Sequence, residues 1–126
     1  MAYLVNFNTL RDKRGELTPI DGVLPFEIKR LYYIGNITEG HDRGGHSHVI
    51  TVEAIVCMAG SFTVYINNGR EIKEFFLDTR SKCLIIEPYD WHKIHSFSPD
   101  ALLMGISSTS YDHSDYIHEE PPIPQP

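Results

Sequence analysis

His46 and His48 lie two positions apart in the run Arg43-Gly44-Gly45-His46-Ser47-His48, directly after an arginine and two glycines. In an extended strand, side chains alternate between the two faces, so both imidazoles would point the same way with their Cα atoms about 7 Å apart. Two imidazoles that face one cavity can share a metal ion, or they can move protons on a bound substrate. The pair is therefore the first candidate for a functional site, and the spacing alone leaves both chemistries open.

The elements that would position this pair are strands and turns. Short apolar, β-branched and aromatic runs bounded by turn residues predict strands at 26–34, 52–58, 62–66, 71–77, 83–87, 91–97 and 101–107. Asn67-Asn68-Gly69 is typical of a hairpin turn. The regular spacing and the lack of helical periodicity predict an all-β sandwich or barrel, in one domain spanning 1–126. Four of the eight prolines fall in 119–126, so we expect an extended or disordered tail there.

The composition narrows the class of protein. The formal net charge is −6, and no basic cluster is present, which argues against nucleic acid as a partner. A small anionic ligand stays compatible, because it needs only one or two arginines. No apolar run approaches the roughly 18 residues of a membrane span, and the N-terminus lacks the pattern of a secretory signal. Cys57 and Cys83 lie in apolar runs, so we expect buried, reduced thiols in a cytoplasmic protein rather than a disulfide or a nucleophile.

Five residues follow one another at intervals that resemble the first sequence motif of the cupin superfamily. The fold of that superfamily is a jelly-roll β-barrel of two antiparallel sheets. These residues are Gly40, His46, His48, Glu53 and Gly60. In many cupins the two histidines and the glutamate bind a metal ion, and a second motif adds another histidine. Here that motif would be Pro88-Tyr89-Asp90-Trp91-His92, which lacks the usual glycine and places its histidine one residue early. The resemblance implies that His92 lies near the first pair, so a metal site of three histidines and Glu53 is one open alternative.

Further motifs between residues 7 and 118 resemble one branch of the cupins, the sugar-nucleotide 3,4-ketoisomerases. In chain order they are Arg14 to Leu17, Leu24 to Ile34, Arg43 to His48, Pro88 to His92, Phe97 to Ala101 and Ser108 to Ile117. The resemblance implies an isomerase that moves the carbonyl of dTDP-4-keto-6-deoxyglucose from C4 to C3 in deoxysugar biosynthesis, without a metal or other cofactor. It also implies a homodimer that exchanges N-terminal strands. The chain departs from the family pattern at two places. Glu53 stands where the family commonly has glutamine. At the end of the chain, His118 and prolines replace an arginine and an aromatic-rich segment.

The implied reaction assigns roles to named residues. The proton at C3 must leave, an enediol must form, C4 must be reprotonated, and protons must shift between the two oxygens. Imidazole suits this work because its pKa lies near 6.5. We expect His48 to act at carbon and His46 at the oxygens, although the reverse fits the sequence equally well. Tyr33 would donate a catalytic hydrogen bond to a sugar oxygen. The expected substrate-binding residues are Arg43, Arg30, Glu53, His92, His95 and Trp91.

Three questions stay open at the level of sequence. A metal-dependent cupin enzyme such as a dioxygenase would use His46, His48, Glu53 and His92 as ligands. A non-catalytic cupin would use the same residues only to bind a sugar nucleotide. For an isomerase, the configuration at C4 of the product, galacto or gluco, is undetermined by residue type.

Overall fold

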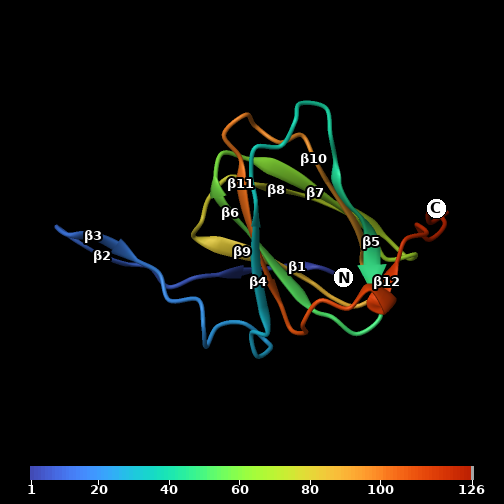
Figure 1. Cartoon of the computed structure of the whole chain (residues 1–126), viewed down its shortest axis with the longest axis horizontal. Coiled ribbons are helices and arrows are strands. Elements are labelled where there is room, and N and C mark those ends of the chain that lie inside the picture. Colours follow the sequence, from blue (N-terminus) through green and yellow to red (C-terminus); the bar gives the residue numbers. More distant parts are fainter. Residues whose placement is uncertain (126) are drawn as a thin grey trace.

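Two five-stranded antiparallel sheets face each other in the computed structural model, which describes residues 1–125 (Figure 1). The first sheet has, in spatial order, β1 (Tyr3–Asn6), β9 (Lys82–Ile86), β6 (Glu53–Ala59), β11 (Leu102–Ser107) and β4 (Arg30–Ile34). The second has β12 (Tyr116–Ile117), β5 (Arg43–His48), β10 (Trp91–His95), β7 (Phe62–Asn67) and β8 (Ile72–Leu77). The prediction of an all-β fold built from two antiparallel sheets is confirmed.

The core between the sheets follows from the alternation of side chains along each strand. On β7, Phe62, Val64 and Ile66 are fully buried and face the first sheet, while the residues between them are less buried. On β6 and β9 nearly every residue is buried, because the segment from Ile20 to Ile28 covers the outer face of the first sheet. Strands buried on both faces are apolar throughout rather than alternating. This covering segment also explains why β4 begins only at Arg30, although a strand was predicted from residue 26.

The two cysteines lie in this doubly covered sheet. Cys57 is on β6 and Cys83 on β9, and both are free and buried, as predicted. Burial raises the pKa of the Cys83 thiol to about 11. Neither residue has the electropositive surroundings that make a cysteine reactive.

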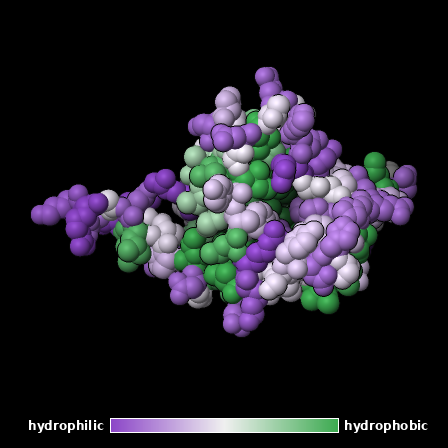
Figure 2. Space-filling model, viewed as in Figure 1, coloured by the Kyte–Doolittle hydropathy of each residue, from purple (hydrophilic) through white to green (hydrophobic). Residues whose placement is uncertain are grey.

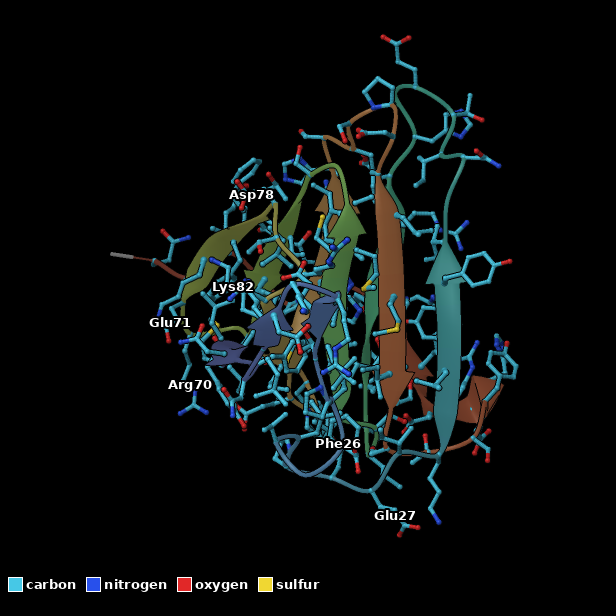
Figure 3. All side chains as sticks on the ribbon, turned by 90° about the vertical axis from the view of Figure 1, so that its left-hand side faces the viewer. Phe26, Glu27, Arg70, Glu71, Asp78 and Lys82 are labelled. Atoms are coloured by element: carbon cyan, nitrogen blue, oxygen red, sulfur yellow. The ribbon has the colours of Figure 1, made fainter. Side chains whose placement is uncertain are left out.

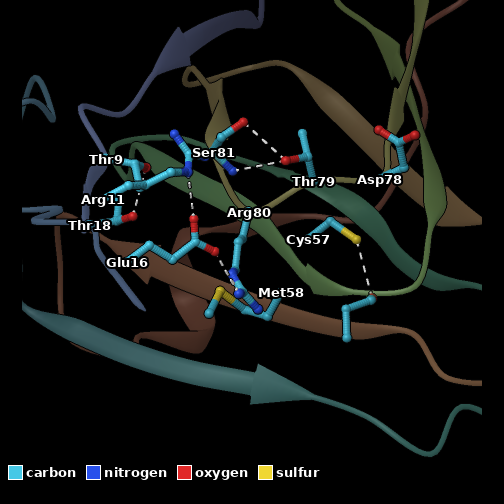
Figure 4. A pocket seen from close by; sticks show the side chains of 11 residues that line it. Thr9, Arg11, Glu16, Thr18, Cys57, Met58, Asp78, Thr79, Arg80 and Ser81 are labelled. Carbon is cyan, nitrogen blue, oxygen red and sulfur yellow. Dashed lines mark hydrogen bonds and ion pairs between the residues drawn. The ribbon is translucent and has the colours of Figure 1, made fainter. Parts of the chain in front are cut away.

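A hairpin of β2 (Leu10–Asp12) and β3 (Gly15–Leu17) projects from the body of the molecule (Figure 1). Figure 2 shows hydrophilic residues along this projection and a hydrophobic area on the body beside it. Leu10 and Leu17 are 58% and 62% exposed on the hairpin. At its base, Glu16 accepts hydrogen bonds from Arg11 and from Arg80 of the β8–β9 loop, at 3.1 and 2.8 Å (Figure 4). Exposed ion pairs contribute at most about 1 kcal/mol, so this contact tethers the hairpin only weakly.

The C-terminal segment packs on the outer face of the second sheet. The indole N–H of Trp91 donates to the carbonyl of His118 at 3.1 Å. One carboxylate oxygen of Glu120 accepts from the hydroxyl of Tyr65 at 2.8 Å and from the side-chain amide of Asn67 at 2.9 Å. The expected tail is therefore extended and held against β7 and β10 at these positions, and residue 126 lies outside the described residues.

The neighbouring residues Phe26 and Glu27, which precede β4, point in different directions. Glu27 points away from the body at the end of the first sheet, whereas Phe26 packs against it (Figure 3). A single 3-10 turn, η1 (His113–Asp115), precedes β12. Within residues 1–125, no helix has the length and apolar character needed to cross a bilayer.

Candidate active site

A cavity of about 290 Å³ lies between the two sheets and opens at one end of the barrel. Its walls come from β4, β5, β6 and β10, with Tyr116 of β12 at one side. The polar residues that line it are Arg30, Tyr32, Tyr33, Arg43, His46, Glu53, His92 and Tyr116. Most of the residues expected in the site therefore gather here.

Three histidines cluster at this cavity, of which His46 and His92 line it and His48 lies behind them. His46 lies opposite His92 in the β5–β10 ladder, and His48 follows two residues later on the same face of β5. The ring centroids of His46 are 5.0 Å from His48 and 4.7 Å from His92. Gly44 permits this close approach, because it has φ of +82° and a Cβ there would lie 2.9 Å from the carbonyl oxygen of His92.

His48 lies between two carboxylates and is only 3% exposed. Its Nδ1 is 3.1 Å from an oxygen of Asp115, and its Nε2 is 3.2 Å from an oxygen of Glu53. The Nε2 atom makes no aligned hydrogen bond with any described residue, so its contact with Glu53 is an ion pair. Burial alone would lower the pKa of His48, but the two carboxylates outweigh burial and raise it. A carboxylate at each nitrogen thus favours the protonated ring of His48.

Glu53 is nearly fully buried and is the shared partner of the site. Burial favours its neutral form, yet the contact with His48 and the hydroxyl of Tyr32 outweigh burial and lower the pKa of the carboxyl. Tyr32 donates to its other oxygen at 3.1 Å. Glu53 is therefore a carboxylate that holds both a tyrosine hydroxyl and an imidazolium.

The other two histidines are neutral. Nδ1 of His92 is 3.0 Å from the carbonyl oxygen of Asp90, and because a carbonyl only accepts, this nitrogen carries the hydrogen. Nε2 of His92 is then an acceptor. His46 lines the cavity and is half-buried; burial, and next the proximity of His92 and His48, lower its pKa to about 4. His46 is thus an unprotonated base beside a protonated neighbour.

The two adjacent tyrosines of β4 point in opposite directions. The Tyr32 hydroxyl reaches Glu53, and burial, followed by the charge of Glu53, raises the pKa of the phenol well above its ordinary value. Tyr33 is 79% exposed at the rim. The inward hydroxyl therefore belongs to Tyr32 and not to Tyr33, the residue expected from the sequence to donate the catalytic hydrogen bond.

Trp91 and His95 do not line the cavity, contrary to expectation. Alternation along β10 places them on the opposite face from His92 and Ile94. Trp91 packs under the C-terminal segment, and Nε2 of His95 lies 3.6 Å from Glu74 beside a separate surface groove of about 710 Å³. Their expected contacts with substrate do not fit this arrangement.

Two residues that the sequence did not assign to the site are part of it. Asp115 holds His48, and the Tyr116 ring lies 4.4 Å from that of His46 and 4.6 Å from that of His48. Both belong to the run Ser108 to Ile117 that carried part of the family resemblance. That resemblance was the only signal for them, because their distance along the chain from His48 hides the contact.

The histidine cluster also has donors suited to a transition-metal ion. One ligand atom from each of His46, His48 and His92 lies within 4.8 Å of the others. Imidazole nitrogens suit zinc, copper, iron and nickel. His48, however, has a carboxylate at each nitrogen, so a metal ion would have to displace its proton and its contact with Glu53. The residue types of this cluster nevertheless fit a metal ion.

Comparison with known proteins places this geometry in a family. The family model described as "FdtA: WxcM-like, C-terminal" matches residues 2–121. The TDP-4-oxo-6-deoxy-alpha-D-glucose-3,4-oxoisomerase of Aneurinibacillus thermoaerophilus is 37% identical over 118 residues, which are 92% of this chain and 85% of that protein.

Solved structures of 3,4-ketoisomerases have the same fold as this chain. A 3,4-ketoisomerase from Helicobacter canadensis superposes with a TM-score of 0.90 at 32% identity, over 94% of this chain and 90% of the other. The sugar 3,4-ketoisomerase QdtA from Thermoanaerobacterium thermosaccharolyticum, in complex with TDP, gives 0.89 at 35% identity, over 94% and 88%. A histidine-to-asparagine variant of QdtA was solved in complex with TDP-4-keto-6-deoxyglucose.

Proposed function

The chain belongs to the FdtA family of WxcM-like proteins, and on that basis we propose that it is a TDP-4-keto-6-deoxyglucose 3,4-ketoisomerase in deoxysugar biosynthesis. One observation in the site supports this most directly. A neutral imidazole, His46, lies 5.0 Å from an imidazolium, His48, at the floor of an open cavity. A base and a cation side by side are what proton removal next to a ketone requires.

His46 carries out the proton transfers at the carbon atoms. It takes the proton from C3; the C–H electrons form the C3–C4 double bond, and the C4 carbonyl electrons move to its oxygen. The resulting enediolate is then reprotonated at C4 by the same imidazole, while the C3 oxygen becomes the carbonyl. This reverses the role expected from the sequence for His48, since both nitrogens of His48 face carboxylates and only His46 of the two lines the cavity.

The oxygens need one net proton transfer from the C3 hydroxyl to the C4 oxygen. Tyr32 lines the cavity and donates to Glu53, so it can pass its proton to the C4 oxygen and regain one from the C3 hydroxyl. His48 stabilises the negative charge of the enediolate through the cationic ring behind Glu53. No proton is lost or gained over the cycle.

The diphosphate is bound by Arg30 and Arg43. Both line the cavity, and neither is ion-paired with any carboxylate in residues 1–125. The Arg30 guanidinium lies 4.8 Å from the centre of the Tyr32 ring and 5.1 Å from that of Tyr111, which holds it in a fixed orientation. Guanidinium groups bind phosphate oxygens through paired donors.

The protein acts as a homodimer that exchanges its projecting β2–β3 hairpin. β1 pairs with β9 of its own chain, whereas the hairpin presents Leu10 and Leu17, which lie opposite each other in the β2–β3 ladder and stay largely exposed. Light scattering coupled to gel filtration would give a dimer mass, and deletion of residues 10–17 would give a monomer. A monomeric full-length protein would contradict the exchange. The cytoplasm, where Cys57 and Cys83 stay reduced, is the expected compartment.

The deciding experiment incubates the protein with TDP-4-keto-6-deoxyglucose in deuterated water and follows the product by NMR. We expect a 3-keto sugar nucleotide, with deuterium at C4 in those turnovers in which the proton on His46 exchanges with solvent, and the coupling constants give the galacto or gluco configuration. A protein that binds the sugar nucleotide without either change would be a binding protein only. The histidine cluster favours one rival, a metal-dependent cupin enzyme; stoichiometric metal, with activity lost on chelation, would support that rival instead.

A further inference from the structure

Asp115 is a buried carboxylate that the reaction scheme above does not use. It is 8% exposed, and every group that faces it is a donor. One oxygen accepts from the backbone N–H of Ile50 at 2.8 Å; the other accepts from the N–H of Thr51 at 3.2 Å and from the Thr51 hydroxyl at 2.5 Å. Because an ionised carboxylate can only accept, the His48 Nδ1 atom 3.1 Å away must carry its hydrogen.

Backbone contacts before and after Asp115 in the chain hold its carboxylate in place. Asp115 ends the η1 turn, which Asp112 caps by accepting from the N–H of Ser114 at 3.0 Å. The carbonyl of Asp115 accepts from Val49 at 3.0 Å, and Tyr116 pairs with His48 in the β12–β5 ladder. Because these contacts hold the Asp115 side chain in place, the His48 ring must orient toward Asp115.

This orientation determines where the second nitrogen of His48 points. With Nδ1 bound to Asp115, Nε2 faces Glu53 of β6, and the rings of His46, His92 and Tyr116 surround the remaining faces. Without that anchor the ring could turn over, and the ion pair with Glu53 would be lost. Glu53 in turn holds the Tyr32 hydroxyl.

We propose that Asp115 is a positioning residue for the isomerisation, which acts through His48 by fixing the orientation of its ring. The proposal rests on the proposed function for its catalytic readout, and on the Asp115–His48 contact for its structural one. Outer partners that orient an active-site histidine typically account for 10- to 100-fold in activity.

The test compares Asp115→Asn with wild type. The amide keeps the size of the side chain but removes the charge that holds the His48 Nδ1 proton. We expect kcat to fall roughly 10- to 100-fold while KM for TDP-4-keto-6-deoxyglucose changes less than about threefold. Asp112→Ala is the matched control: it disturbs the same turn without touching His48, and kcat should stay within about threefold of wild type.

A spectroscopic readout separates positioning from simple support of the fold. In wild type, the His48 Nδ1 proton should give a slowly exchanging downfield NMR signal, assigned by its loss in His48→Asn, and it should vanish in Asp115→Asn. A folded Asp115→Asn protein with wild-type kcat would overturn the proposal. So would wild-type protein without that signal, even if the variant fails to fold. If wild type makes no 3-keto sugar but shows the signal, the proposed function fails and the Asp115–His48 contact stands.

Discussion

Gly105 and Tyr32 face each other across the β11–β4 ladder, and the tyrosine ring fills the space that a Cβ at position 105 would need. The ring lies flat over the glycine because nothing projects from it. This lets the Tyr32 hydroxyl extend to Glu53 at the floor of the cavity. The absence of a side chain on β11 thus lets Tyr32 of β4 reach into the cavity.

Gly105→Ala should remove Tyr32 from its place. We expect kcat to fall at least about tenfold, as for Tyr32→Phe, with a loss of stability of roughly 1–3 kcal/mol from overpacking. Steady-state kinetics and thermal unfolding measure the two effects. Gly35→Ala is the control, because its Cβ would meet only the flexible end of the Leu102 side chain at 3.2 Å. A Gly105→Ala protein with the wild-type rate would show that Tyr32 does not act.

Exchange of each histidine for asparagine tests which one acts at carbon. His46→Asn should lower kcat by roughly 10²- to 10⁴-fold, because it removes the base, while TDP affinity changes little. His48→Asn should also impair turnover, but deuterium exchange at C3 should persist slowly. If exchange at C3 survives in His46→Asn and disappears in His48→Asn, the roles are reversed.

The pH profile should reflect the opposite shifts of the two imidazoles. His46 has a pKa of about 4, so activity should fall only when the pH drops toward that value and the base becomes protonated. The pKa of His48 is raised above the ordinary 6.5, so activity should also fall as the pH rises through that higher value and the imidazolium is lost. A profile of kcat/KM against pH should therefore be bell-shaped, with a broad plateau. An acid limb centred near 6.5 would contradict the neutral state of His46.

The same shift predicts how stability depends on pH. Because the folded protein binds the His48 proton more tightly than the unfolded chain, this contribution is fully present below 6.5 and is lost as the pH rises through the folded pKa. Urea unfolding of wild type and His48→Gln across this range measures it. The difference in stability between the two proteins should shrink as the pH rises, and a difference that does not change with pH would exclude the charged form.

Glu53→Gln distinguishes a proton-transfer site from a metal site. Glutamine can still accept a hydrogen bond from Tyr32, but it no longer supplies the charge opposite His48. We expect kcat to fall less than about tenfold and the activity to be unaffected by chelators. Metal content by mass spectrometry provides the check, and a chelator-sensitive wild type with an inactive Glu53→Gln variant would favour a metal ligand.

The sequence predicted the parts of the molecule that local pattern determines. β6 and β9 are continuous apolar runs, and His46 and His48 share a face through simple alternation. The same alternation says that Tyr32 and Tyr33 face opposite ways, and the packing of Tyr32 and Ile34 against the core between the sheets decides which tyrosine points inward. β2 and β3 are short and largely polar, and β12 has only two residues, so no pattern marked them. The apolar residues Phe26 and Ile28 suggested a strand at 26–28. In the structure they pack over the face of the first sheet and do not pair with its strands.

The contact between His48 and Asp115 joins positions 67 residues apart in the chain. β12 pairs with β5 across this long separation, and non-local pairings form slowly because loop closure costs entropy first. We therefore expect the His48–Asp115 contact to form late in folding. In a refolding experiment, recovered turnover would report the arrival of this last strand, after fluorescence of the buried Trp91 has detected collapse of the barrel.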